Sequence, residues 1–225
     1  MHKIRWLVVF PIALILSAQR LHATEGSGLT EFKKDSIFKS SGGNFSLGMR
    51  STVNMFSDGV PAFGMGVGAS ARLQLLDRLN TEWFGDYMTS NLYNKANRTD
   101  VHIGWNVMFY ILKPKGFTRK FTPFVAAGNC FDYSGIRLNG PNQPLYDRWT
   151  SAVQMSLGCH YNITPRFDIS LSTLYMIHLG KEIDADLEKD GSVSITEHRD
   201  AAWEGHIMFV ISVHYKIAKL WKPKG

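Results

Sequence analysis

The stretch 44-NFSLGMRSTVNMF-56 alternates between apolar and polar residues over most of its length. One face of an extended chain would carry Phe45, Leu47, Met49, Val53 and Met55, and the other would carry Ser46, Gly48, Arg50, Thr52 and Asn54. A repeat of two residues indicates a β-strand, because successive side chains of a strand point to opposite sides. This stretch therefore predicts a strand with one apolar and one polar face.

The same alternation recurs along most of the chain. It predicts eight strands, at residues 44–56, 63–73, 79–88, 100–111, 121–132, 151–162, 168–178 and 202–217. The connections at 75–78, 113–120 and 163–166 are short, whereas those at 57–62, 89–99, 133–150 and 179–200 are longer and more polar. Short periplasmic turns and long extracellular loops are typical of outer-membrane barrels. The predicted fold is therefore all-β: an eight-stranded antiparallel up-and-down transmembrane β-barrel at residues 44–217.

The two ends of the chain differ from this alternating region. The basic residues His2, Lys3 and Arg5 precede the apolar run Trp6–Leu16, which is too short to cross a bilayer as a helix. Small residues follow, so residues 1–23 are predicted to be a secretory signal peptide, with the exact cleavage site left open. Residues 24–43 are predicted to be a periplasmic linker, and residues 218–225 a C-terminal tail.

The charge of the chain excludes one class of partner. The sequence has 25 basic and 19 acidic residues. Cleavage after Ala23 would remove Lys3, Arg5 and Arg20, and the remaining 22 basic residues would give a net charge of +3. So small an excess gives no support to binding of nucleic acid.

Alternation alone does not decide which face points outward, since a soluble lipocalin-like barrel also alternates. Three features favour the membrane form: polar-face glycines that suit a crowded lumen, strands of about ten residues that match a tilted bilayer crossing, and aromatic residues at the ends of the apolar faces. The predicted aromatic girdle comprises Trp83, Tyr87, Trp105, Tyr161, Tyr175, Trp203 and Tyr215. The predicted location is the cell outer membrane. A soluble periplasmic binder of an apolar ligand is the alternative.

Three segments carry a family resemblance: 121-FTPFVAAG-128, 161-YNITPRFDISL-171 and 76-LDRL-79. Through them the chain resembles, over residues 44–217, the small outer-membrane β-barrel superfamily that includes the OmpA transmembrane domain, OmpX and the opacity proteins. Within this group it is most similar to uncharacterised barrel proteins of the Bacteroidota. The resemblance implies strand–turn–strand architecture and no particular chemistry. Such barrels often finish on an aromatic residue, whereas this chain continues past Tyr215 with 218-AKLWKPKG-225.

Pairing the predicted strands about their turns brings charged residues of the polar face together. It sets Arg72 across from Glu82, Asp86 across from His102, and Arg50 beside Ser70. The predicted lumenal polar cluster is therefore Arg50, Arg72, Glu82, Asp86 and His102. Because buried charges must be paired, a structural role is the first interpretation. An acid/base site that uses Asp86 and His102 is the alternative.

No metal site, cofactor or disulfide is predicted. The in-strand histidines His102, His160, His178, His206 and His214 share the polar face but belong to four strands and different depths. The acidic run at residues 184–191 lacks the spacing of an EF-hand loop, so we interpret it as a solvated loop. Cys130 and Cys159 differ in facing and depth, and both are predicted to be free thiols.

The leading functional hypothesis is a non-enzymatic barrel with a structural, adhesive or surface-interaction role through its extracellular loops. Its expected partners are outer-membrane lipid, lipopolysaccharide and an extracellular partner. Phosphates of lipopolysaccharide could contact the basic loop residues Lys95, Arg98, Arg137, Arg148, Lys181, Lys189 and Arg199. The alternatives are a lipid A deacylase or acyltransferase, which would need a lipid-facing Ser/His/acid set or an apolar lumen, and a channel for small solutes.

Overall fold

The computed structural model describes residues 42–55, 63–92, 94–114, 119–188, 193–202 and 205–221. The expected signal peptide and residues 24–41 of the expected linker lie outside these ranges. All the strands belong to one compact unit, Ser36–Gly225. None of the described residues forms a helix long and apolar enough to cross a membrane.

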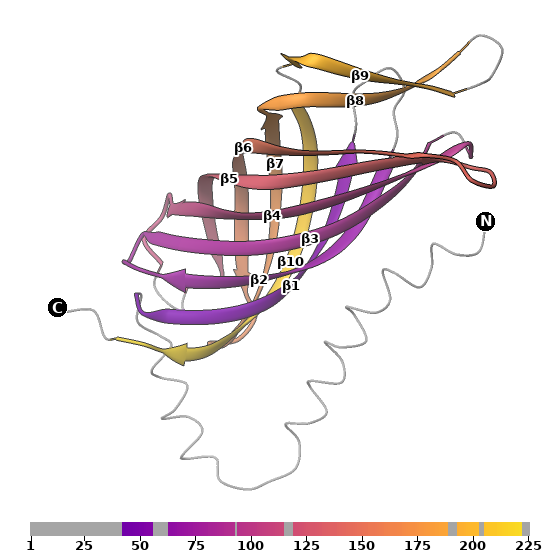
Figure 1. The fold of residues 1–225 in the computed structure, drawn as a ribbon. Helices are drawn as coiled ribbons and strands as arrows, with labels where there is room; N and C mark the ends of the chain where they lie inside the picture. Colours follow the sequence, from indigo (N-terminus) through magenta and orange to yellow (C-terminus); the bar gives the residue numbers. More distant parts are fainter. Residues whose placement is uncertain are drawn as a thin grey trace, which may run out of the picture. The chain divides into compact units, whose positions relative to one another are not determined.

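The described part of the chain contains ten strands, eight of which close into a barrel (Figure 1). They are β1 (Asn44–Met55), β2 (Phe63–Gln74), β3 (Leu79–Leu92), β4 (Ala96–Tyr110), β5 (Phe121–Leu138), β6 (Leu145–Asn162), β7 (Phe167–His178), β8 (Gly180–Leu187), β9 (Val193–Ala202) and β10 (Gly205–Lys219). Each barrel strand pairs antiparallel with its neighbours, and β1 closes the barrel against β10. The predicted eight-stranded barrel is confirmed. The short hairpin β8–β9 is an addition that the alternation did not predict.

The faces of the strands are inverted relative to a soluble protein. Among the described residues, 28 polar or charged side chains are buried, against 16 hydrophobic ones. The outward faces carry large exposed apolar side chains such as Leu157 (65% exposed), Met155 (63%) and Leu171 (58%). A chain that puts its polar face inside and its apolar face outside is suited to lipid, because a soluble lipocalin-like barrel needs the reverse.

Several strands extend further than the sequence predicted at the end of the barrel opposite the short turns. β5 and β6 have 18 residues each, whereas β1, β2 and β7 have 12. Much of the predicted loops 89–99 and 133–150 is therefore paired strand, and six extra residues add about 20 Å along a strand. The alternation of apolar and polar residues is weaker in these extensions, although the backbone pairing continues. The connections at residues 93–95 and 139–144 are correspondingly short.

The hairpin β8–β9 occupies most of the predicted loop 179–200 and lies at the end of the barrel opposite the short turns. Ile183 of β8 is 3% exposed and packs in one cluster with Leu92, Ala96 and Ile136. Those three residues are buried positions near the far ends of β3, β4 and β5. The hairpin therefore covers the inward side of this extended end.

The register confirms two of the three predicted pairs. Arg72 lies opposite Glu82, and Asp86 lies opposite His102. The pairing of Arg50 with Ser70 is wrong, since Arg50 lies opposite Gly68. The error is two residues, which leaves every side chain on its predicted face. Residue types alone do not reveal this register.

At Gly68, β2 lies so close to β3 that a larger side chain has no space, so a substitution there tests how crowded the interior is. A methyl group on Gly68 would collide with the Asp86 carboxylate and the Gly85 carbonyl, whereas the nearest atom to one on Gly85 is the His102 carbonyl oxygen at 4.0 Å.

We predict that Gly68→Ala destabilises the barrel by about 1–3 kcal/mol, as overpacking does. The matched change Gly85→Ala should be neutral or slightly stabilising. Urea unfolding of the refolded protein in detergent, followed by tryptophan fluorescence, measures both. Equal effects of the two substitutions would contradict the prediction.

Candidate functional site in the barrel interior

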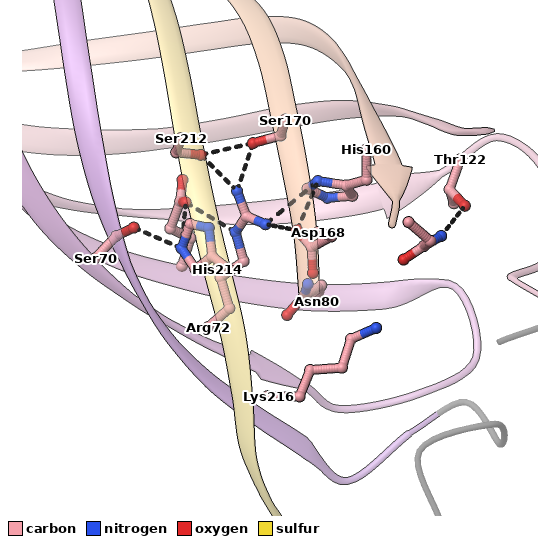
Figure 2. Close-up of polar contacts among 12 residues, drawn as sticks. Ser70, Arg72, Asn80, Thr122, His160, Asp168, Ser170, Ser212, His214 and Lys216 are labelled. Carbon is pink, nitrogen blue, oxygen red and sulfur yellow. Dashed lines mark hydrogen bonds and ion pairs between the residues drawn. The ribbon is translucent and has the colours of Figure 1, made fainter. Parts of the chain in front are cut away.

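Arg72 of β2 organises the end of the lumen nearest the short turns (Figure 2). Its Nε donates to Glu82 Oε1 at 3.0 Å, and one terminal nitrogen contacts Asp168 Oδ1 at 3.1 Å and His160 Nδ1 at 3.3 Å. The other terminal nitrogen donates to Ser170 Oγ (2.8 Å) and Ser212 Oγ (3.0 Å). These contacts correspond in number to the five N–H groups of a guanidinium. One buried side chain thus binds β2 to β3, β6, β7 and β10.

Arg50 of β1 continues this network toward the middle of the barrel. Its terminal nitrogens lie 3.2 Å from Glu82 Oε2 and 3.0 Å from Asp86 Oδ2. Its guanidinium also lies over the Phe84 ring, 4.3 Å from the centroid. A central ion-pair chain results, in which charges of opposite sign alternate in the order Asp168, Arg72, Glu82, Arg50, Asp86.

The structure thus joins four members of the predicted lumenal cluster in one ion-pair chain, and the fifth, His102, lies opposite Asp86 without an ion pair to it in that chain. His102 contacts Asp132 of β5, with Nε2 2.9 Å from Oδ1. Sequence reasoning missed two acidic residues: Asp168, which ends the central ion-pair chain, and Asp132, which contacts His102. Their positions on the polar faces were the available signal. Pairing neighbouring strands about their turns could not show which residues meet across the lumen. The functional role of the predicted cluster stays a prediction.

An outer histidine cluster, His102, Asp132, His178 and His206, lies toward the long end of the barrel. Asp132 is 0% exposed at its side chain and contacts His178 Nδ1 at 3.0 Å as well as His102. The Nε2 atom of His178 lies 3.0 Å from Nδ1 of His206. Where the chain is described, no three His, Cys, Asp or Glu side chains are placed to hold a metal ion. Here the ring nitrogens of His178 and His206 face each other.

A second buried pair has the composition of a nucleophilic site without its geometry. Ser70 Oγ lies 2.7 Å from His214 Nε2, and the nearest acid, Glu82, is 3.9 Å from that same nitrogen (Figure 2). A Ser–His–acid triad needs the acid on the other ring nitrogen, where it orients the imidazole. His214 is 0% exposed, so substrate has no access to it.

The part of the lumen around Arg50 and Arg72 is closely packed. A cavity of about 10 Å³ lies there, lined among others by Arg50, Arg72, Glu82 and Asn106. A volume of this size holds about one water molecule. The interior therefore offers side-chain packing and paired charge, with no continuous bore at this level.

The residues of the predicted aromatic girdle face outward where they are described. Trp83, Tyr87, Trp105, Tyr161, Tyr175 and Tyr215 are 40–53% exposed, and Trp203 lies outside the described residues. The sequence missed a further pair, Tyr133 and Trp149, whose rings lie 5.1 Å apart. Trp149 and Tyr161 are twelve residues apart on β6. At the tilt usual for such barrels this separation spans about 30 Å, close to the thickness of a bilayer core.

Other predicted residues have mixed outcomes. Cys130 and Cys159 are free thiols, as predicted. Arg148 is a buried residue 3.7 Å from Asp132, so its assignment to a phosphate-binding loop surface is wrong. Arg98 forms an ion pair with Asp100 at 2.9 Å, while Lys95 and Arg137 are exposed.

The acidic run starts within β8 rather than in a loop, and residues 189–192 lie outside the described ranges. The side chains of Lys181, Lys189 and Arg199 are also outside the described part.

We predict that Arg72→Ala destabilises the barrel by about 3–5 kcal/mol, because it leaves Glu82 and Asp168 buried without their partner. Adding Glu82→Gln and Asp168→Asn should recover part of this loss. As a control, Lys113→Ala removes an exposed ion pair with Asp77 and should cost about 0–1 kcal/mol. Urea unfolding reports all three. Equal losses for Arg72→Ala and Lys113→Ala would refute a structural role for Arg72.

Comparisons with known proteins support the fold. No protein-family model and no curated protein matches the chain. Among solved structures, Neisserial surface protein A matches with a TM-score of 0.57 at 13% identity, covering 79% of this chain and 99% of that one. A major outer membrane protein from Thermus thermophilus matches with a TM-score of 0.51 at 9% identity, covering 77% and 99%. The chain therefore has the fold of small outer-membrane β-barrels.

Proposed function

We propose that this protein is a closed, non-enzymatic β-barrel of the outer membrane that acts through the part of the barrel protruding from the cell surface. The observation that carries the proposal is the inverted polarity of the barrel. Ion pairs and histidines fill its interior, and large apolar side chains cover its outside. In water, so much exposed apolar surface on every strand would drive aggregation, whereas lipid accommodates it.

The orientation follows from the two ends of the barrel. Both chain ends of the described barrel meet beside the short turns, where Leu220 N donates to Gly43 O at 2.8 Å. Barrels of this class have short periplasmic turns and longer extracellular connections. We therefore place residues 75–78 and 163–166 in the periplasm, and the extended ends of β3, β4, β5 and β6 outside the cell.

The extended ends form the proposed interaction surface. Above the level of Trp149 the outward side of the β5–β6 hairpin carries exposed Leu145, Asp147 and Arg137. This surface lies on a paired, rigid sheet, so it can contact a partner at little cost in conformational entropy. Lipopolysaccharide at the base of the sheet and an extracellular partner at its tip are the partners that we propose. Kinship with barrel proteins of the Bacteroidota stays a prediction.

Two alternatives have less support. A channel for solutes conflicts with the filled lumen around Arg72. A lipid A-modifying enzyme needs either a reactive set facing lipid or an apolar lumen. All five in-strand histidines are buried in the polar lumen, and the Ser70–His214 pair has no access to lipid.

We predict that the protein is recovered from the outer-membrane fraction and that its migration on a gel shifts on boiling. An epitope inserted in residues 139–144 should bind antibody on intact cells. The same epitope inserted in residues 163–166 is the matched control and should bind only after permeabilisation. Recovery as a soluble periplasmic protein would overturn the location, and the opposite labelling pattern would overturn the orientation.

We further predict that purified protein leaves lipid A unchanged in mass on incubation in mixed micelles. The polar lumen has no space for an acyl chain, and the buried histidines cannot reach an ester bond. Mass spectrometry of the extracted lipid measures this. Loss or gain of an acyl chain that depends on His178 or His214 would refute the non-enzymatic assignment.

A further inference from the structure

Four sulfur-bearing side chains meet in the lumen between the central ion-pair chain and the outer histidine cluster. They pack in one buried cluster and are between 0% and 2% exposed: Met88 of β3, Cys130 of β5, Met176 of β7 and Met208 of β10. The same cluster contains Phe84, Ala152 and Leu174. Four strands thus bring a thiol and three thioethers together, and we call these four residues the sulfur cluster.

The sulfur cluster lies one layer of side chains inward from the outer histidine cluster. On three strands its residue stands two positions from a member of that cluster: Met176 before His178, Met208 after His206, and Cys130 before Asp132. A spacing of two residues puts both side chains on the same face of a strand. The sulfur atoms therefore have imidazoles and a carboxylate on their outer side.

Small residues beside the sulfur side chains give them space. Gly66 lies opposite Met88, and a methyl group there would collide with Met88 Cγ. Gly104 of β4 lies opposite Cys130, and a methyl group there would collide with Cys130 Cβ. On the other side of β5, Cys130 lies opposite Ala152 of β6. The short side chain of Ala152 leaves space for Cys130 to reach past β6 to the next strand, β7.

Cys130 and Met176 are spaced like two ligands of one ion. The Cys130 thiol donates to the Met176 thioether at an Sγ–Sδ distance of 3.8 Å. Two sulfur atoms that each bind one ion at about 2.3 Å, the usual distance from a metal to a thiolate, lie about 3.8 Å apart at a tetrahedral angle. Met88 and Met208 pack in the same cluster. The rotatable bonds of a methionine let its sulfur turn toward an ion without movement of the backbone.

The ligand types favour a soft ion. Thiolate and thioether sulfur bind Cu(I), whereas Mg²⁺ and Ca²⁺ prefer oxygen. A site made largely of thioethers also differs from sets of His, Cys, Asp and Glu, none of which the described residues place to hold a metal ion.

The charge balance of the buried site favours a monovalent ion. When such an ion replaces the thiol proton of Cys130, the proton is released and the buried group stays neutral. A divalent ion would add a positive charge, which is costly to bury without a partner. The charged neighbours of Cys130 are Asp132, Asp86 and Arg50. Both carboxylates already contact basic side chains, so neither is free to balance a second charge.

We propose that the sulfur cluster is a binding site for Cu(I). The Cys130 thiolate and the Met176 thioether are its first two ligands, and Met88 and Met208 supply further thioethers. Binding exchanges the Cys130 proton for the metal ion and leaves the oxidation state of the metal unchanged. The imidazoles of the outer histidine cluster are also ligands for copper, and they lie where an ion from the outer end of the barrel would pass. This site goes beyond the surface role proposed above.

Competition with bicinchoninate, a coloured chelator of Cu(I), tests the proposal on the full protein refolded in detergent. All samples carry Cys159→Ala, because the second free thiol would bind Cu(I) independently. Cu(I) is kept reduced with ascorbate and is supplied in one series before refolding and in another after it. We expect one ion per chain to be withheld from the chelator. If the chelator retains all the Cu(I) in both series, the proposal is wrong.

Substitutions that remove sulfur but keep the side-chain volume identify the ligands. Met176→Leu should raise the Kd for Cu(I) at least tenfold. Met108→Leu is the matched control, because Met108 is 1% exposed but belongs to a different buried cluster, and its Kd should not change. Exchange of methionine for leucine costs little stability, and gel migration before and after boiling verifies folding.

An unchanged Kd in folded Met176→Leu, or an equal rise in Met108→Leu, would refute the assignment of the ligands. If Met176→Leu does not fold, Met208→Leu is measured in its place under the same criteria.

Discussion

The interior of an eight-stranded barrel is too narrow to hold bulk water, so side chains must fill it and every buried charge must find a partner there. In this protein Arg72 meets that constraint for five strands at once, through contacts with Glu82, Asp168 and three neutral groups. Arg50 likewise forms an ion pair with the buried Asp86. The polar interior thus fixes which strands meet and in what register, while the lipid-facing surface contributes little specificity.

The sequence revealed the parts of the fold that depend on one strand and its neighbour. Alternation identified the barrel strands and their faces, and counting about a tight turn placed Arg72 opposite Glu82. The sequence did not reveal contacts across the lumen, because these depend on how the whole sheet closes. The ion pair of Arg72 with Asp168 is an example. The strand extensions to Leu138 and from Leu145 were missed for a different reason: their residues alternate less clearly between apolar and polar, although the backbone pairing continues.

The two charge groups differ in what their chemistry permits. Every strong charge in the central ion-pair chain is a guanidinium or a carboxylate. The outer histidine cluster contains three imidazoles and one carboxylate. The central ion-pair chain therefore joins groups of full and opposite charge, whereas the outer histidine cluster joins one carboxylate to imidazoles.

This division also bears on where function resides. Close packing around Arg50 and Arg72 gives no support to transport at that level, and burial of Ser70 and His214 gives none to hydrolysis at that pair. What distinguishes this chain from a minimal bilayer-spanning barrel is the extra length of β5 and β6 and the hairpin packed against their end. Residues that add length beyond the bilayer contribute nothing to crossing it. Their paired backbone and buried Ile183 instead build a firm surface at that end of the barrel, where the proposed interaction surface lies.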